Sequence, residues 1–222
     1  MIEVDHEFSM KKLVEHYNRK VKYYPEFGLE GWHLQKEVST ISGILNSILN
    51  KKVCKKALDI ACHDGRYSFL LQEKGLDVIG IDTSEKSLAH AESLRERKKL
   101  TNVRFQKMDA TELSLTEKFD IIILMELLHH LPDRLAAKTI GNALNHLEND
   151  GFLIFDLKNQ YNPVIRYVYK KNSSHNLLLK ARTMNFFRKT VQDAGARIVL
   201  QKGLVTPFWQ IEPFVIVVVQ KD

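Results

Sequence analysis

Two carboxylates lie at or near the ends of apolar segments in the first half of the chain. In α/β proteins, nucleosides bind at such strand ends. Asp59 lies near the end of an expected strand at 56–61, and Asp82 ends a second expected strand at 77–82. Between them lie the tight turn Ala61-Cys62-His63-Asp64-Gly65 and a short helix that stops at Gly75. An acid about 20 residues beyond such a turn can accept hydrogen bonds from both hydroxyls of a ribose. The pattern therefore predicts a nucleoside-binding unit.

Further polar side chains follow the next two expected strands. Asp109 comes directly after a strand at 103–107, and Glu126 and His130 lie in the run MELLHHL at 125–131, after a fourth strand. Imidazole titrates near neutral pH, so His130 is a candidate general base, as is Glu126. A structural hydrogen bond is the alternative for His130, and helix capping is the alternative for Asp109.

The turn resembles the D-x-G-x-G-x-G signature of class I S-adenosylmethionine-dependent methyltransferases, with Asp59, Ala61, His63 and Gly65 at the matching positions. Two of the three usual glycines are replaced. Alanine at position 61 predicts a negative φ there, and His63 would project toward the methionine end of the cofactor. A dinucleotide fold would require G-x-G-x-x-G, which is absent; NAD is therefore the weaker fit.

The resemblance implies that S-adenosylmethionine lies across the carboxyl ends of the strands. It assigns the ribose to Asp82, the adenine side to Asp109, and the methionine end to the turn. The run at 125–131 resembles the E-x-L-x-H-L segment of small-molecule members, which makes Glu126 and His130 the catalytic candidates. No metal site is expected. The expected cofactor-binding set is Asp59, Ala61, Cys62, His63, Gly65, Asp82, Thr83, Met108, Asp109, Ala110 and Met125.

Apolar periodicity predicts an α/β fold in which strands and helices alternate. The loop at 206–213 is too short for a parallel crossover, so the last two strands form an antiparallel pair. With the resemblance, this gives a three-layer α/β/α fold, a seven-stranded, mostly parallel sheet with an antiparallel last strand, and an N-terminal helical extension. The expected helices are 6–24, 33–50, 65–74, 84–98, 133–147 and 183–195, and the strands are 56–61, 77–82, 103–107, 120–124, 152–156, 197–204 and 214–219.

Positive charge is concentrated in one segment. The chain carries +6, whereas residues 158–190 contain eight basic residues and no acid, so the remainder sums to −2. We expect one domain over 1–222: a helical lid at 1–52, a cofactor-binding core at 53–157, a basic acceptor-side insertion at 158–190, and a C-terminal hairpin at 191–222. The insertion suits an anionic or amphipathic acceptor; a solvated basic face is the alternative.

Composition is that of an ordinary globular protein. No apolar run is long enough to span a membrane, the N-terminus lacks a secretory core, and two cysteines are too few for a disulfide framework. A cytoplasmic protein is therefore expected.

The predicted function is methyl transfer from S-adenosylmethionine to an O, N or C nucleophile of a small molecule. Three alternatives remain: an RNA methyltransferase that uses the basic segment, a cofactor-binding protein without catalysis, and an NAD-linked enzyme. Against RNA, the fourth strand is followed by MELL and not by an N-P-P-Y-like motif. The identity of the acceptor and the oligomeric state stay open.

Overall fold

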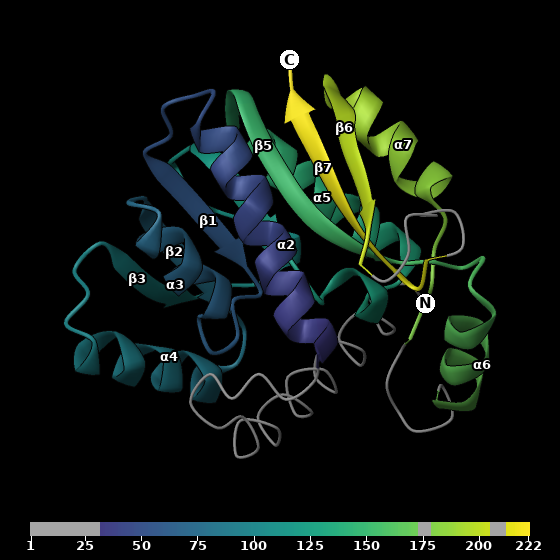
Figure 1. Ribbon diagram of the computed structural model, residues 1–222, viewed down its shortest axis with the longest axis horizontal. Helices are drawn as coiled ribbons and strands as arrows, with labels where there is room; N and C mark the ends of the chain where they lie inside the picture. The colour runs from purple at the N-terminus through teal and green to yellow at the C-terminus, as the bar shows by residue number, and fades with distance from the viewer. Residues whose placement is uncertain (1–31, 173–178, 205–211) are drawn as a thin grey trace.

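The computed structural model describes residues 32–172, 179–204 and 212–222. The helix predicted at 6–24 lies outside the described residues. Those described form a seven-stranded sheet in the order β3-β2-β1-β4-β5-β7-β6, in which β7 is antiparallel to both neighbours (Figure 1). The predicted fold class is confirmed. The strands are β1 (Lys56–Ile60), β2 (Asp77–Asp82), β3 (Val103–Lys107), β4 (Phe119–Leu124), β5 (Leu147–Lys158), β6 (Ala196–Gly203) and β7 (Phe214–Lys221).

Helices cover both faces of the sheet (Figure 1). One face packs against α2 (Trp32–Leu49), α3 (Arg66–Glu73) and α4 (Glu85–Arg97). The other face packs against α5 (Asp133–Asn145) and α7 (Met184–Asp193). Helix α6 (Pro163–Asn172) stands to one side, and the short 3-10 helices η2 (Ala110–Glu112) and η3 (Leu128–His130) follow β3 and β4.

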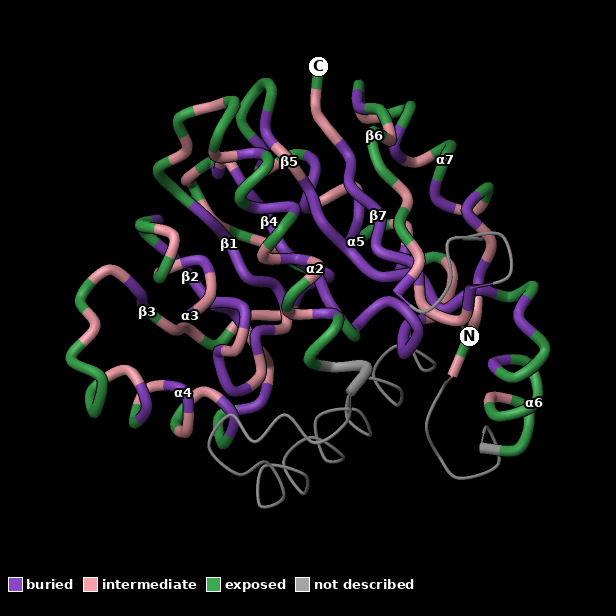
Figure 2. The backbone as a smooth tube through the Cα atoms, viewed as in Figure 1, coloured by how far each residue is buried: buried purple, intermediate pink, exposed green. Residues whose placement is uncertain are grey.

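The central strands are buried on both faces, as Figure 2 shows for β1, β4 and β5. Their side chains alternate between the two layers: Leu58 and Ile122 lie in the core beneath α5 and α7, whereas Ile121 and Ile123 lie beneath α2 and α3. This explains why β4 reads as an almost continuous apolar run. The same alternation turns Asp59 and Asp156 toward the α2–α3 layer.

Strand β5 begins earlier than predicted. Leu147 already pairs with Phe119, and the next pair joins Phe152 to Ile121. Residues 149–151, which precede the predicted strand at 152–156, therefore form a bulge inside β5, in which Asp150 adopts a φ of 59°.

Helix ends follow local chemistry in two places and tertiary contacts in a third. The Ser84 side chain accepts the N–H of Ser87, and Gly75 closes α3 with a φ of 84°, as predicted. Asp133, the first residue of the helix predicted at 133–147, does not cap α5, because Pro132 occupies the N-cap position. The Asp133 carboxylate pairs with Lys180 and Arg182, from beyond α6.

The parallel strands end together at one edge of the sheet, the lower edge in Figure 1. In open α/β sheets, ligands bind outside these carboxyl ends. Every candidate residue of the sequence analysis lies in the loops at this edge or directly beneath them.

Candidate functional site at the carboxyl edge of the sheet

The turn after β1 alternates left-handed residues. Ala61, His63 and Gly65 have φ values of 59°, 48° and 84°. The prediction that Ala61 has a negative φ is therefore wrong. Left-handed backbone costs an alanine roughly 1–2 kcal/mol. Hydrogen bonds hold the turn nonetheless, because the Cys62 N–H donates to the Ile81 carbonyl at 2.9 Å and the Gly65 N–H to the Cys62 carbonyl at 2.8 Å.

Gly65 is required by space as well as by φ. A Cβ there would lie 2.8 Å from Cζ of Phe105 and 2.9 Å from Cε2 of Phe69. Those two rings pack edge to face, with centroids 5.7 Å apart. Gly80 on β2 meets the same constraint, since its Cβ would lie 2.6 Å from Phe105. Sequence reasoning missed Gly80, because a glycine inside an apolar strand gives little local signal.

Asp59 lies beneath the turn and is 1% exposed. Its Oδ2 accepts the Ser68 hydroxyl from α3 at 2.6 Å. Burial raises the pKa of this carboxyl to about 7, although the Ser68 hydrogen bond lowers it. The contact ties the end of β1 to the helix that follows the turn.

Asp82 stands at the tip of β2, half-buried, and its carboxylate accepts backbone N–H groups. Its Oδ2 accepts the His63 N–H at 3.0 Å, and its Oδ1 accepts the Ser84 N–H at 2.8 Å. Burial raises the pKa of the carboxyl, and hydrogen bonds from the backbone of Ser84, His63 and Thr83 oppose that rise. Since a carboxylate offers about four acceptor positions, Asp82 keeps capacity for the hydroxyls of a ribose while it fixes the turn.

The residues after β3 lie beside Asp82. The Met108 N–H donates to the Asp82 carbonyl at 3.0 Å. Asp109 caps η2, because its Oδ1 accepts the Thr111 N–H at 2.7 Å and the Thr111 hydroxyl at 2.9 Å. Ala110 is buried and Thr83 is half-buried. Asp109 thus makes the helix-capping contact that the sequence analysis gave as its alternative role.

Cys62 and His63 differ in environment. Cys62 is buried, and burial raises the pKa of its thiol well above the usual value. A buried thiol of this kind is a packing group and not a nucleophile. His63 is partly exposed, with Nδ1 3.8 Å from the Asp64 carboxylate.

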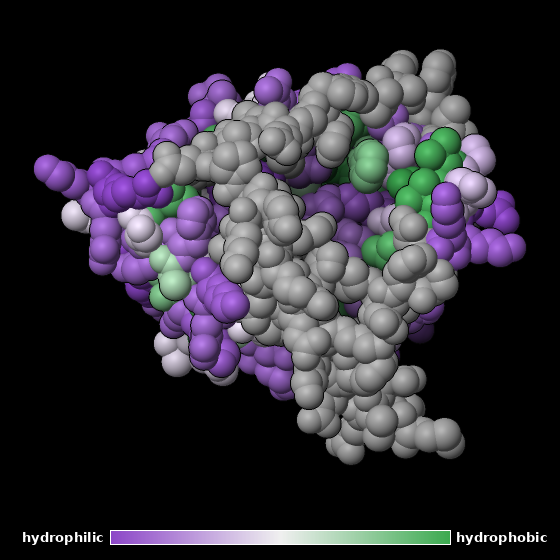
Figure 3. Space-filling model, turned by 90° about the horizontal axis from the view of Figure 1, so that it is seen from below, coloured by the Kyte–Doolittle hydropathy of each residue, from purple (hydrophilic) through white to green (hydrophobic). Residues whose placement is uncertain are grey.

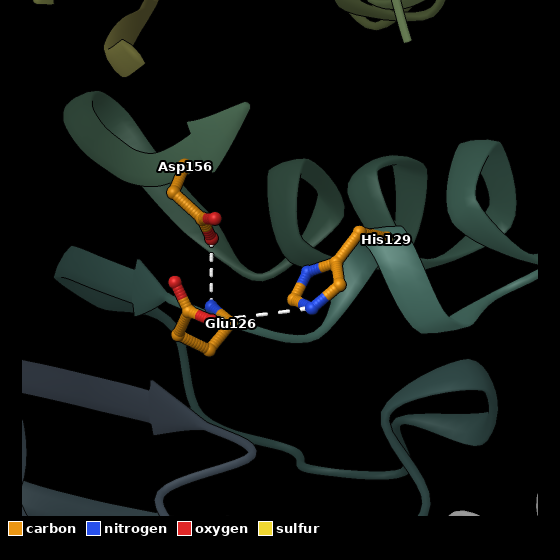
Figure 4. Close-up of side chains that lie close together, drawn as sticks. All are labelled: Glu126, His129 and Asp156. Atoms are coloured by element: carbon orange, nitrogen blue, oxygen red, sulfur yellow. Dashed lines mark hydrogen bonds and ion pairs between the residues drawn. The ribbon is translucent and has the colours of Figure 1, made fainter. Parts of the chain in front are cut away.

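The loop after β4 carries a second group of polar residues. Glu126 has a φ of 58°, directly after the buried Met125. Its N–H donates to Oδ1 of Asp156 at 2.7 Å, and its carboxylate lies 3.9 Å from Nε2 of His129 (Figure 4). Glu126 is thus brought together with His129, which the sequence analysis had not named as a candidate.

His130 serves the loop itself. It is buried, its N–H donates to the Leu127 carbonyl at 2.9 Å, and its ring centroid lies 3.9 Å from that of His129. These contacts fit the structural alternative for His130.

Lys158 joins the Glu126 loop to the end of β5. Its Nζ contacts Oε1 of Glu126 and lies 2.9 Å from Oδ2 of Asp156. Burial by itself would lower the pKa of Lys158, but the charges of Asp156 and Glu126 raise it. The ammonium also lies 4.4 Å from the centroid of the Phe214 ring.

Arg182 is a second buried cation of the basic segment. Its guanidinium donates to the Leu128 carbonyl at 2.6 Å, to the Leu131 carbonyl, and to Asp133 at 3.0 Å. Lys158 and Arg182, two of the eight basic residues of 158–190, are thus buried and add no charge to an exposed basic surface. Both are internal cations: Lys158 compensates the buried Asp156 carboxylate of β5, and Arg182 compensates buried carbonyls of the loop after β4.

Glu37 on α2 reaches the same region and was missed by sequence reasoning. It is buried and accepts the Tyr67 hydroxyl. Burial, and then the charges of Glu126 and Asp156, raise its pKa to about 7, against the effect of Lys158. The signal available in the sequence was an acid on the apolar side of an amphipathic helix.

Glu126, His129 and Asp156 bring ligand atoms within 4.8 Å of one another, which is close enough to hold a metal ion. The Lys158 ammonium already lies against both carboxylates. A divalent cation there would meet that positive charge at short range. We therefore derive no metal chemistry from this cluster.

The fold and this edge define the class: the sheet order, the antiparallel β7 and the acid-ended β1 and β2 are those of a class I S-adenosylmethionine-dependent methyltransferase. The sequence model of the methyltransferase domain family matches residues 51–203. The chain belongs to this family, whose cofactor is S-adenosylmethionine.

Curated relatives match over part of their length. The ubiquinone biosynthesis O-methyltransferase of Acinetobacter baylyi is 32% identical over 81 residues, which is 36% of this chain and 34% of that protein. The protein of the same name from Coxiella burnetii is 35% identical over 107 residues, 48% of this chain and 44% of that protein. The chain thus spans about a third to under half of these relatives.

Solved structures share the fold across nearly the whole chain. Magnesium protoporphyrin IX methyltransferase from Synechocystis, with bound SAH, has a TM-score of 0.74 at 18% identity and is covered completely, as is this chain. N-methyltransferase NodS from Bradyrhizobium japonicum, also with SAH, has a TM-score of 0.70 at 15% identity, covering 94% of this chain and 97% of that one. Separately, no helix in the described ranges combines the length and apolarity needed to cross a bilayer.

Proposed function

We propose that this methyltransferase transfers the methyl group of S-adenosylmethionine to an oxygen of a small hydroxyl-bearing molecule. The observation that carries the proposal is the half-exposed Glu126 carboxylate, held at the carboxyl edge beside the nucleoside-binding turn. A carboxylate there can accept the hydrogen bond of a hydroxyl and take its proton. The names of the curated relatives, which are O-methyltransferases, support oxygen as the methylated atom.

The cofactor-binding residues fit this assignment. Asp82 would accept the ribose hydroxyls, Met108, Asp109 and Ala110 would line the adenine side, and the turn Ala61–Gly65 would face the methionine end, with Thr83 and Met125 beside them. Asp59 would act from below by holding the turn through Ser68. When bound, the cofactor supplies a methyl group on a positively charged sulfur, which is a strong electrophile.

The chain's own contribution is mainly alignment. An acceptor oxygen held in line with the methyl group gains most of its rate from position. Glu126 would orient the acceptor hydroxyl and accept its proton. His130 would act indirectly, by keeping the loop in shape.

Helix α6 suits an anionic or amphipathic acceptor. Arg166, Lys170 and Lys171 are its basic residues, and Val164 and Tyr167 are 63% and 66% exposed. Figure 3, which looks onto the carboxyl edge, shows hydrophobic residues gathered on the side where α6 lies. In this proposal α6 is the acceptor-side element of residues 158–190 in a single domain spanning 1–222. Within the lid predicted at 1–52, α2 instead packs against a face of the sheet, and residues 1–31 lie outside the described residues.

Calorimetry and product analysis test the proposal. S-adenosylmethionine and S-adenosylhomocysteine should each bind with micromolar affinity, about −8 kcal/mol, and NADH should give no heat. Incubation with the cofactor and catechol or protocatechuate should yield the methyl ether, detected by mass spectrometry.

Benzylamine and a short single-stranded RNA serve as matched acceptors of other chemistry. N-methylated benzylamine without any methyl ether would contradict the assignment to oxygen. Methylated RNA, with an affinity that falls steeply with salt, would favour a nucleic-acid acceptor. Cofactor binding without any methylated product would favour a non-catalytic role.

A further inference from the structure

Glu126 depends on a buried ion pair from another strand. Its backbone is left-handed, with a φ of 58°, which side chains other than glycine rarely adopt. Such a conformation persists only where the surroundings impose it. The group that binds its N–H, at 2.7 Å, is the Asp156 carboxylate, 30 residues further along the chain.

The same strand also binds the Glu126 side chain. Lys158 lies two residues after Asp156 on the same face of β5, and its Nζ contacts the carboxylates of both Asp156 and Glu126. Main chain and side chain of Glu126 are therefore both bound from β5. Because the two contacts are made at different atoms of Glu126, together they fix the direction of its side chain, which a single contact would not do.

Exposure separates the three residues. The side chains of Asp156 and Lys158 are 2% and 3% exposed, whereas that of Glu126 is 47% exposed. A ligand at the edge of the sheet would thus meet Glu126 and not the pair beneath it. The contacts of the pair with Glu126 give it a route to the reaction through the loop after β4.

A gain in folding stability is a weak explanation for the presence of such a buried ion pair. Both charges lose their hydration on burial, and well-packed apolar residues of similar volume often replace a buried ion pair without loss of stability. We propose that Asp156 and Lys158 are positioning residues for methyl transfer, which hold the loop after β4 so that the Glu126 carboxylate faces the acceptor. The inference rests on the proposed role of Glu126.

The test replaces the pair by apolar residues in one double variant, Asp156→Leu with Lys158→Met, so that neither member of the pair is left buried without the other. A matched control, Lys56→Met with Glu117→Leu, removes a surface ion pair at the opposite edge of the sheet, where Nζ and Oε2 lie 2.6 Å apart. Glu117 also pairs with Arg104, which is exposed and stays hydrated in the control. Both proteins should unfold at a urea concentration near that of the parent. A single Lys158→Met variant would be less informative, because it leaves the buried Asp156 carboxylate without its counter-ion.

Hydrogen exchange in the ligand-free protein gives the first readout. Peptides covering 125–131 should exchange at least tenfold faster in the Asp156→Leu/Lys158→Met protein, and at the parental rate in the control. Peptides from β7, which pairs with β5, should be unchanged in both. Parental exchange at 125–131 in a folded double variant would overturn the inference, whatever the acceptor is.

Turnover with protocatechuate gives the second readout. The double variant should bind S-adenosylhomocysteine within twofold of the parent and lose at least tenfold in kcat. Glu126→Gln should lower kcat/KM at least tenfold in the parent but less than threefold in the double-variant background, because both changes remove one function. Independent, multiplicative losses would contradict positioning through Glu126. A parent that methylates no hydroxyl probe would instead overturn the proposed O-methyl transfer, while exchange still decides the role of the pair.

Discussion

The two halves of the carboxyl edge are built differently. At the ends of β1 and β2, the carboxylates bind groups from one short stretch of chain: Asp59 binds Ser68, and Asp82 binds backbone N–H groups of residues 63 and 84. At the ends of β4 and β5, Glu126 is held by Asp156 and Lys158, and Glu37 arrives from α2.

The difference separates two ways of making a site. A turn that binds a nucleoside needs left-handed backbone and nearby N–H groups, which neighbouring residues can supply. A site that orients an acceptor needs buried, paired charges beneath its exposed residue. Here those charges are Asp156 and Lys158, which are distant from Glu126 in the sequence. We therefore expect substitutions at β1–β2 to alter cofactor binding and local strain, and those at β4–β5 to alter turnover.

The largest expected effect is at the turn. Gly65→Ala should cost about 2–5 kcal/mol of unfolding free energy, because a left-handed alanine is strained and its Cβ would overlap Phe105 and Phe69. Gly75→Ala is the matched control: it has the same φ of 84° but no atom within 4 Å of the added Cβ. It should cost only about 1–2 kcal/mol. Equal losses in urea unfolding would show that space around Gly65 is unimportant.

A pH-dependent effect is expected on the acceptor side. The pKa of Glu37 is about 7 in the folded protein, above its usual 4.5, so the folded state binds this proton more tightly than the unfolded chain. The stability that Glu37 contributes is present below pH 4.5 and is lost as the pH rises to 7. Relative to Glu37→Gln, the parent should lose on the order of 3 kcal/mol over that interval. Urea unfolding across this range measures the difference, and parallel pH profiles would refute it.

Asp82 should matter most for cofactor affinity. Asp82→Ala should weaken S-adenosylhomocysteine binding by roughly 1.5–3 kcal/mol, since charge-assisted hydrogen bonds to the ribose are lost. Asp82→Asn should lie between, because its carbonyl oxygen still accepts one N–H. Asp77→Ala, at the opposite end of β2, is the control and should bind like the parent. A folded alanine variant with affinity within twofold of the parent would reject the ribose assignment.

His63 tests whether the turn needs a side chain there. His63→Gly should change stability by no more than about 1 kcal/mol, because relief of the left-handed φ offsets the added freedom of the unfolded chain. Cofactor binding and turnover should persist. If turnover were lost while calorimetry showed intact cofactor binding, His63 would be assigned a role toward the acceptor and not toward the cofactor.

The smallest effect is expected on α6. Changing Arg166, Lys170 and Lys171 together to Gln should raise the KM for protocatechuate a few-fold and leave cofactor affinity unchanged. The attraction is partly long-range, so added salt should weaken acceptor binding more in the parent than in the variant. Arg188→Gln with Lys189→Gln on α7 is the control within the same basic segment. An unchanged KM would make the exposed charge of α6 a solvated face.

Several elements were predictable because their signals are local. Gly75 and Ser84 mark helix ends through backbone conformation and side-chain capping, and the apolar run of β4 reports burial on both faces. The short loop before β7 required an antiparallel partner, which the sheet confirms. The start of β5 was missed because a bulge at Asp150 keeps the pairing going through a segment that looks like a turn.

The sequence by itself determined the alternation of strands and helices, the antiparallel last pair and the positions of Asp59 and Asp82, because these signals lie in neighbouring residues; the resemblance to the family added the seven-stranded sheet. It determined the family for the same reason, since the motif from Asp59 to Asp82 is contiguous. Only the tertiary structure decided which charges are internal. Lys158 and Arg182 look like members of a basic surface in the chain, and become buried partners of Glu126 and of the carbonyls at 128 and 131. Whether a charged side chain is an internal partner or part of the surface depends on the dielectric around it and on the groups it faces. Both arise only when distant segments pack.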